Sequence, residues 1–142
     1  MGEAIQFQRG KNIGHGSWCL PVFNLANITA AGDAVTDFIP GFAGKIKKWY
    51  WVQGTPVTTA AKAATLNLEV GAVNVEDGGG ANSTIALTSA ACTPLGKTIA
   101  GGTIGARNTF DNDDTISVEA ASVTAFVEGA GTIVIEYEYN IL

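Results

Sequence analysis

Histidine and cysteine are scarce in this chain, and their scarcity removes several classes of function. His15 is the only histidine, so a Ser-His-Asp or Cys-His arrangement has one imidazole to draw on, and it lies in a glycine-rich stretch. Cys19 and Cys92 are far apart and have no partner at zinc-ligand spacing. Each is expected to be a small buried hydrophobic residue. The sequence predicts no catalytic residue, no metal ligand and no cofactor.

Charge is also scarce, and what there is has the wrong sign for nucleic acid. The chain has 8 basic and 13 acidic side chains, and its longest basic run is the pair Lys47 and Lys48. Binding to DNA or RNA depends on neutralising phosphates with clustered lysine and arginine, so no nucleic-acid partner is expected. No stretch approaches the roughly 18 apolar residues of a membrane span, and residues 1–16 lack the order of a signal peptide. We expect a protein made in the cytosol, with no membrane partner.

Short runs of alternating apolar and polar residues dominate the rest of the chain. They are separated by clusters of glycine, asparagine, aspartate and proline, which is typical of an all-β domain. The alternation is clearest in residues 64–75, 114–123 and 131–142. It places one set of side chains in a core: Leu66, Leu68, Val70, Ile116, Val118, Ile133 and Ile135.

About eight such strands and no convincing amphipathic helix predict an antiparallel β-sandwich of jelly-roll type. The one alanine-rich helix candidate, residues 57–65, is flanked by threonines, so a loop or a single turn is favoured. We expect one sandwich domain over residues 17–142, preceded by an extended N-terminal arm over residues 1–16.

The arm is the first candidate for contact with a partner. It has four glycines and too little apolar surface to dock on its own domain, so hydrogen bonds and charge at an interface with a larger assembly are expected to order it. The residues assigned to such an interface are Ile5, Phe7, Arg9, Lys11 and His15.

The run KIKKWYWVQ at residues 45–53 is the second candidate. Strict alternation places Ile46 with Lys48 on one face, and Trp49 and Trp51 with Lys45 on the other. Tryptophan dominates subunit interfaces, so this aromatic face is expected to mediate self-association. The alternative interpretation is that the two tryptophans stack on the rings of a bound sugar.

Two groups of carboxylates resemble functional motifs but have simpler interpretations. Asp111 and Asp113 have the spacing of the first ligands of a calcium loop, yet the glycine and glutamate expected later are absent. A turn with backbone hydrogen bonds to aspartate is favoured there. Glu136 and Glu138 lie two residues apart on one strand, and two solvated glutamates are favoured over a glycosidase pair.

Five segments give the chain a resemblance to the small jelly-roll decoration proteins on the heads of tailed bacteriophages. They are GFAGKIKKWYWV, ATLNLEVGAVNV, TPLGKTIAGGTI, DTISVEAASVTAF and EGAGTIVIEYE, which together span about residues 41–138. The resemblance implies a non-enzymatic virion protein, often a homotrimer, that binds the major capsid protein on the capsid exterior and stabilises the head. Tail and fibre modules of phage particles, or a carbohydrate-binding module, are the alternatives.

Overall fold

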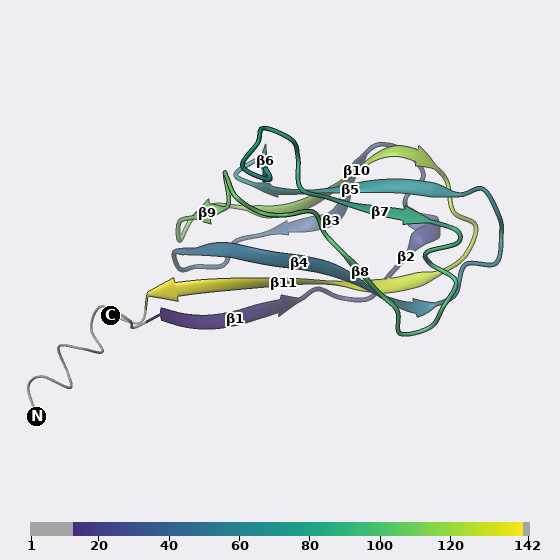
Figure 1. Ribbon diagram of the computed structural model, residues 1–142, viewed down its shortest axis with the longest axis horizontal. Coiled ribbons are helices and arrows are strands. Elements are labelled where there is room, and N and C mark those ends of the chain that lie inside the picture. The colour runs from purple at the N-terminus through teal and green to yellow at the C-terminus, as the bar shows by residue number, and fades with distance from the viewer. Residues whose placement is uncertain (1–12, 141–142) are drawn as a thin grey trace, which may run out of the picture.

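The structure is a computed structural model, and it describes residues 13–140 of the chain. Within this range nearly all regular structure is β-strand, arranged as two antiparallel sheets that pack face to face (Figure 1). The predicted all-β antiparallel sandwich is therefore confirmed, whereas the finer assignment to the jelly-roll class stays a prediction. The two ends of the described chain, Ile13 and Asn140, pair with each other at one end of the sandwich.

The first sheet has six strands in the order β1-β11-β4-β8, with β2 paired to β11 and β9 paired to β4. Its strands are β1 (Ile13–Cys19), β2 (Phe23–Asn24), β4 (Gly44–Thr55), β8 (Thr98–Ala100), β9 (Thr109–Phe110) and β11 (Ala130–Asn140).

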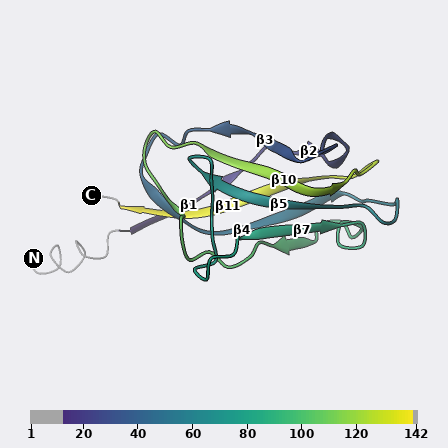
Figure 2. The same cartoon turned by 90° about the horizontal axis from the view of Figure 1, so that it is seen from above.

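The second sheet has five strands in the order β3-β10-β5-β6, with β7 also paired to β5. Figure 2 shows β3, β10, β5 and β7 in this order across the sandwich. The strands are β3 (Gly32–Phe38), β5 (Ala63–Val70), β6 (Val73–Asn74), β7 (Thr84–Thr88) and β10 (Ile116–Thr124).

Helical structure in the described residues is limited to a 3-10 turn, η1 (Leu25–Asn27). Residues 57–62 form no helix, and β5 begins at Ala63, so the loop expected there is confirmed. No helix within residues 13–140 is long and apolar enough to cross a membrane.

The core lies on the faces that the alternating pattern predicts for β5, β10 and β11. Seven residues were expected there and all are buried. Burying a valine, leucine or isoleucine side chain fully stabilises a fold by about 1.5–3 kcal/mol, so each of these positions stabilises the sandwich. The confirmed residues are Leu66, Leu68, Val70, Ile116, Val118, Ile133 and Ile135.

Strand β4 departs from the prediction because it contains a β-bulge. Its pairing with β11 skips one residue, Lys47, between Lys48 and Ile46. An extra residue reverses the alternation of side chains on one side of it. Ile46 therefore lies in the core with Trp49 and Trp51, and it does not share the outer face with Lys48 as strict alternation required.

Strand β1 begins earlier than predicted. Residues 13–16, which were assigned to the arm, form the first part of β1 and pair with β11. Gly14 and Gly16 suit this strand because the rings of Tyr139 and Tyr137 occupy the space beside them. A Cβ atom added at Gly16 would lie 2.5 Å from the Tyr137 hydroxyl oxygen. Gly14 and Gly16 therefore reflect close packing against aromatic rings and not a flexible arm. The rest of the predicted arm, residues 1–12, lies outside the described residues.

One long side of the sandwich is closed by main-chain hydrogen bonds and the other is open. After β8 the chain crosses to the second sheet, where Gly101 N–H donates to the Trp49 carbonyl and Gly102 N–H donates to the Thr84 carbonyl, both at 2.8 Å. On the opposite side, β1 and β3 are each paired along one edge only within the part of the chain that the structure describes. The open side therefore presents unpaired backbone groups.

Candidate interaction surface

The structure describes one of the five residues predicted to contact a partner from the arm. His15 is exposed on the outer face of β1, opposite Glu138 of β11. The other four lie outside the described residues: Ile5, Phe7, Arg9 and Lys11.

The predicted aromatic interface is wrong, because Trp49 and Trp51 belong to the core. Their exposed fractions are 1% and 0%. The indole N–H of Trp49 donates to Ser83 Oγ at 2.9 Å, and that of Trp51 donates to Gln53 Oε1 at 2.6 Å. Side chains buried in their own domain cannot cover a second subunit or stack on a sugar. The lysines that suggested an exposed face, Lys45 among them, point outward because of the bulge at residue 47.

The outer side of β1, β11 and β4 forms a continuous surface that we call the outer sheet face. Side chains lie on it in cross-strand rows, because residues paired across antiparallel strands point to the same side. The rows across these three strands are His15, Glu138 and Lys45; Ser17, Glu136 and Lys48; and Cys19, Val134 and Tyr50.

Charges of opposite sign alternate across the outer sheet face. Lys47 Nζ lies 3.7 Å from Glu138 Oε1, and Lys48 Nζ lies 5.5 Å from the centre of the Tyr50 ring. Exposed ion pairs of this kind contribute about 0–1 kcal/mol to stability, so they do little to hold the fold together. Such charges act mainly on the rate and orientation of association with a charged partner surface.

The second edge of β1, which no strand within residues 13–140 pairs with, borders the outer sheet face and is well suited to strand pairing. Strand β1 pairs with β11 over seven residues without a register shift. It contains no proline or lysine, which are common devices for blocking an edge strand. The edge of β3 is different, since its pairing with β10 is broken by two register shifts and it carries Asp33 and Asp37.

The acidic segment before β10 forms the turn that the sequence favoured, with a backbone hydrogen bond to an aspartate side chain. Asp111 N–H donates to Asp114 Oδ2 at 2.8 Å, which closes the turn on itself. Within residues 13–140, no group of three or more histidine, cysteine, aspartate or glutamate side chains is placed to hold a metal ion. The glutamate pair, Glu136 and Glu138, lies on the outer sheet face opposite Lys48 and Lys45.

The two cysteines have different environments. Cys92 is buried as expected, and desolvation raises the pKa of its thiol to about 11. Cys19 does not fit the expectation, because it is exposed at the end of β1 on the outer sheet face. Its thiol is therefore part of the candidate surface.

Sequence reasoning missed the β1 edge because its first residues were read as an arm. The sequence does contain a signal for this strand, because two glycines spaced by two residues match two tyrosines with the same spacing. Gly14 pairs with Tyr139, and Gly16 pairs with Tyr137. Recognising it requires knowing that the first and last strands are neighbours.

Comparison with known proteins gives little support for any assignment. No protein-family model matches the chain, and no curated protein matches it. A chain from a solved structure described as "Bacillus endospore appendages form a novel family of disulfide-linked pili" is similar at 16% identity and a TM-score of 0.40. The similarity covers 92% of this chain and 90% of that chain. At this identity and TM-score, neither the family nor the function of that protein is assigned to this chain.

Proposed function

We propose that this chain is a non-enzymatic structural protein that decorates and stabilises a bacteriophage capsid by binding the major capsid protein. It would act on the capsid exterior, as a homotrimer. The observation that carries the proposal is the unblocked edge of β1 beside the outer sheet face, His15 included.

The edge favours a protein partner. An unpaired strand offers main-chain donors and acceptors to another extended chain, and this mode of recognition needs no pocket. The alternating charges of the outer sheet face would then fix the register of the partner.

The choice of a phage head as the partner comes from the resemblance of residues 41–138 to decoration proteins. The resembling segments include β10 and most of β4, β5 and β11, which together build both layers of the sandwich. The resemblance therefore concerns the strands that form the sandwich, whereas β1 lies outside the resembling segments.

The proposal is tested by blocking the edge of β1. The double variant His15→Lys/Ser17→Lys places one lysine opposite Glu138 and another opposite Glu136. The domain should therefore fold normally while the edge strand gains positive charge. A matched control, Ala86→Lys/Thr124→Lys, adds the same charge at exposed positions of β7 and β10.

Binding is measured by sedimentation with isolated, undecorated phage heads. We expect the wild type and the control to bind and the edge variant to lose occupancy. Unchanged occupancy of the edge variant would show that β1 is not the contact, and no binding by the wild type would remove the capsid proposal itself.

A further inference from the structure

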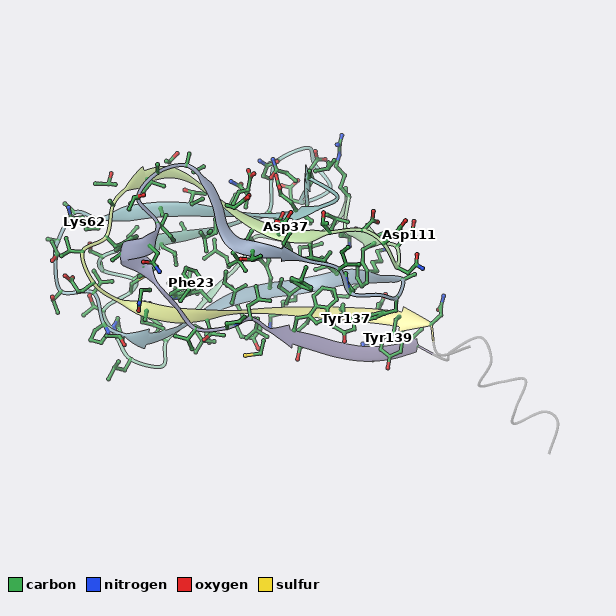
Figure 3. The ribbon with its side chains drawn as sticks, turned by 180° about the vertical axis from the view of Figure 1, so that it is seen from behind. Phe23, Asp37, Lys62, Asp111, Tyr137 and Tyr139 are labelled. Carbon is green, nitrogen blue, oxygen red and sulfur yellow. The ribbon has the colours of Figure 1, made fainter. Side chains whose placement is uncertain are left out.

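An apolar groove lies at the end of the sandwich where the described chain begins and ends. Its volume is about 740 Å³. Figure 3 shows Tyr137, Tyr139 and Asp111 at this end and Lys62 at the opposite end. The groove is lined by aromatic rings from three parts of the chain: Phe42, Phe110, Tyr137 and Tyr139.

The groove exists because β4 is shorter than its neighbour at this end. The last described pair between β4 and β11 is Lys45 with Glu138, whereas β11 continues through Tyr139 and Asn140. Those two residues pair with β1 on one side only. Within residues 13–140, the edge of β11 that faces the groove is therefore unpaired at Tyr139 and Asn140.

The aromatic rings of the groove contact one another as a cluster around Phe42. The ring centre of Phe42 lies 5.3 Å from that of Tyr137, 5.7 Å from that of Phe110 and 5.8 Å from that of Tyr139. Phe42 and both tyrosines remain partly exposed. A segment with apolar side chains at alternate positions would complete both the sheet and this cluster.

We propose that the N-terminal segment of the same chain occupies this groove, adding as a short strand beside β11 with Ile5 and Phe7 packed on the aromatic rings. The segment AIQFQ, residues 4–8, alternates apolar and polar side chains as an added strand requires. Gln6 and Gln8 would then face the solvent.

The chain has the length to reach the groove. Ile13 lines the groove and pairs with Asn140 of β11, and the added strand would lie along the other edge of β11, two strand spacings or about 10 Å from β1. Residues 8–12 span up to roughly 16 Å when extended, and Gly10 and Asn12 among them suit a change of direction. A tethered segment also has an effective concentration near the millimolar range, which favours its own groove over that of a second copy.

Charge is consistent with this path. The charged side chains that line the groove are Lys45, Asp111 and Glu138, so acidic groups outnumber basic ones there. The segment carries Arg9 and Lys11 between Phe7 and the start of β1. The proposal thus assigns Ile5 and Phe7 to the chain's own domain, where the sequence had suggested a partner, and leaves the two basic residues near the surface.

Disulfide trapping tests the placement. In a Cys19→Ser background, the full chain carries Phe7→Cys together with Ala43→Cys, a position that lines the groove. We expect an internal disulfide and a monomeric band on a non-reducing gel. A control pairs Phe7→Cys with Lys62→Cys at the far end (Figure 3) and should not crosslink. Disulfide-linked dimers, or equal crosslinking at residue 62, would overturn the proposal.

A stability measurement gives a second, independent readout. Ile5→Ser/Phe7→Ser should lower the melting temperature by about 5 °C or more, whereas Gln6→Ser/Gln8→Ser should leave it unchanged. The shift should not depend on protein concentration. Equal melting temperatures for the two variants, or a shift that disappears on dilution, would contradict docking within one chain.

Discussion

At the scale of single residues, Glu69 is the clearest case of a charge held in an unfavourable place. It lies on β5 with an exposed fraction of 8%, and Ser117 Oγ donates to its Oε2 atom at 3.2 Å. Burial, together with Glu119 and Asp33 nearby, raises the pKa of this carboxyl above its usual value of 4.5. Folding therefore favours the protonated form of Glu69 over the ionised form.

The sign of the pH dependence follows from this shift. A carboxyl whose pKa is raised by folding contributes stability below its unfolded pKa and loses that contribution as the pH rises through the folded pKa. Glu69→Gln should be more stable than the wild type at pH 7 and lose this advantage at pH 4. Urea unfolding at the two pH values measures both, and a Glu69→Gln protein that is less stable at pH 7 would contradict the assignment.

Trp51 tests the corrected position of the aromatic residues. Because its ring is fully buried, Trp51→Ala should lower the free energy of unfolding by about 3–5 kcal/mol. Tyr50→Ala, on the outer sheet face one residue away, should cost much less. Urea unfolding of the two variants measures both losses of stability. Equal costs would return Trp51 to an exposed face.

At the scale of elements, the bulge in β4 makes a prediction about deletions. Removing Lys47 takes out the extra residue and leaves Ile46, Trp49 and Trp51 on the core face, so the shortened protein should fold with a small loss of stability. Removing Tyr50 shifts the alternation and turns core residues outward, so it should prevent folding. Circular dichroism and thermal melting of both proteins measure this. A folded Tyr50 deletion together with an unfolded Lys47 deletion would contradict the bulge.

The sequence predicts some elements well and others poorly for physical reasons. Strands β5, β10 and β11 bury one face each, so their pattern is regular and their core residues are identified. β8 and β9 are too short to show a period, with three and two residues. The bulge in β4 leaves no mark in composition, because it is fixed by pairing with β11.

The candidate interaction surface is harder to predict than the core, because it too depends on how strands pair. Trp49 and Trp51 attract attention as aromatic residues beside lysines, yet tertiary packing buries them. The β1 edge is built from glycine, serine and His15, which carry no pattern until their pairing with β11 is known. A free edge is a property of the assembled sheet, so no local sequence feature specifies it.

At the scale of the whole molecule, the two long sides of the sandwich differ. The crossing segment after β8 satisfies the backbone on one side through Gly101 and Gly102. On the other side, one edge of β1 has no partner strand among the described residues, and it lies beside a face of alternating charge. This asymmetry gives the molecule one side suited to contact with another protein.

The most direct measurement of the central claim is amide hydrogen exchange of the full chain with and without undecorated phage heads. If the β1 edge and the outer sheet face bind the capsid, exchange should slow in Ile13–Cys19 on binding while Gly32–Phe38 of β3 stays unchanged. Binding with no protection in β1, or with protection confined to the second sheet, would contradict the account.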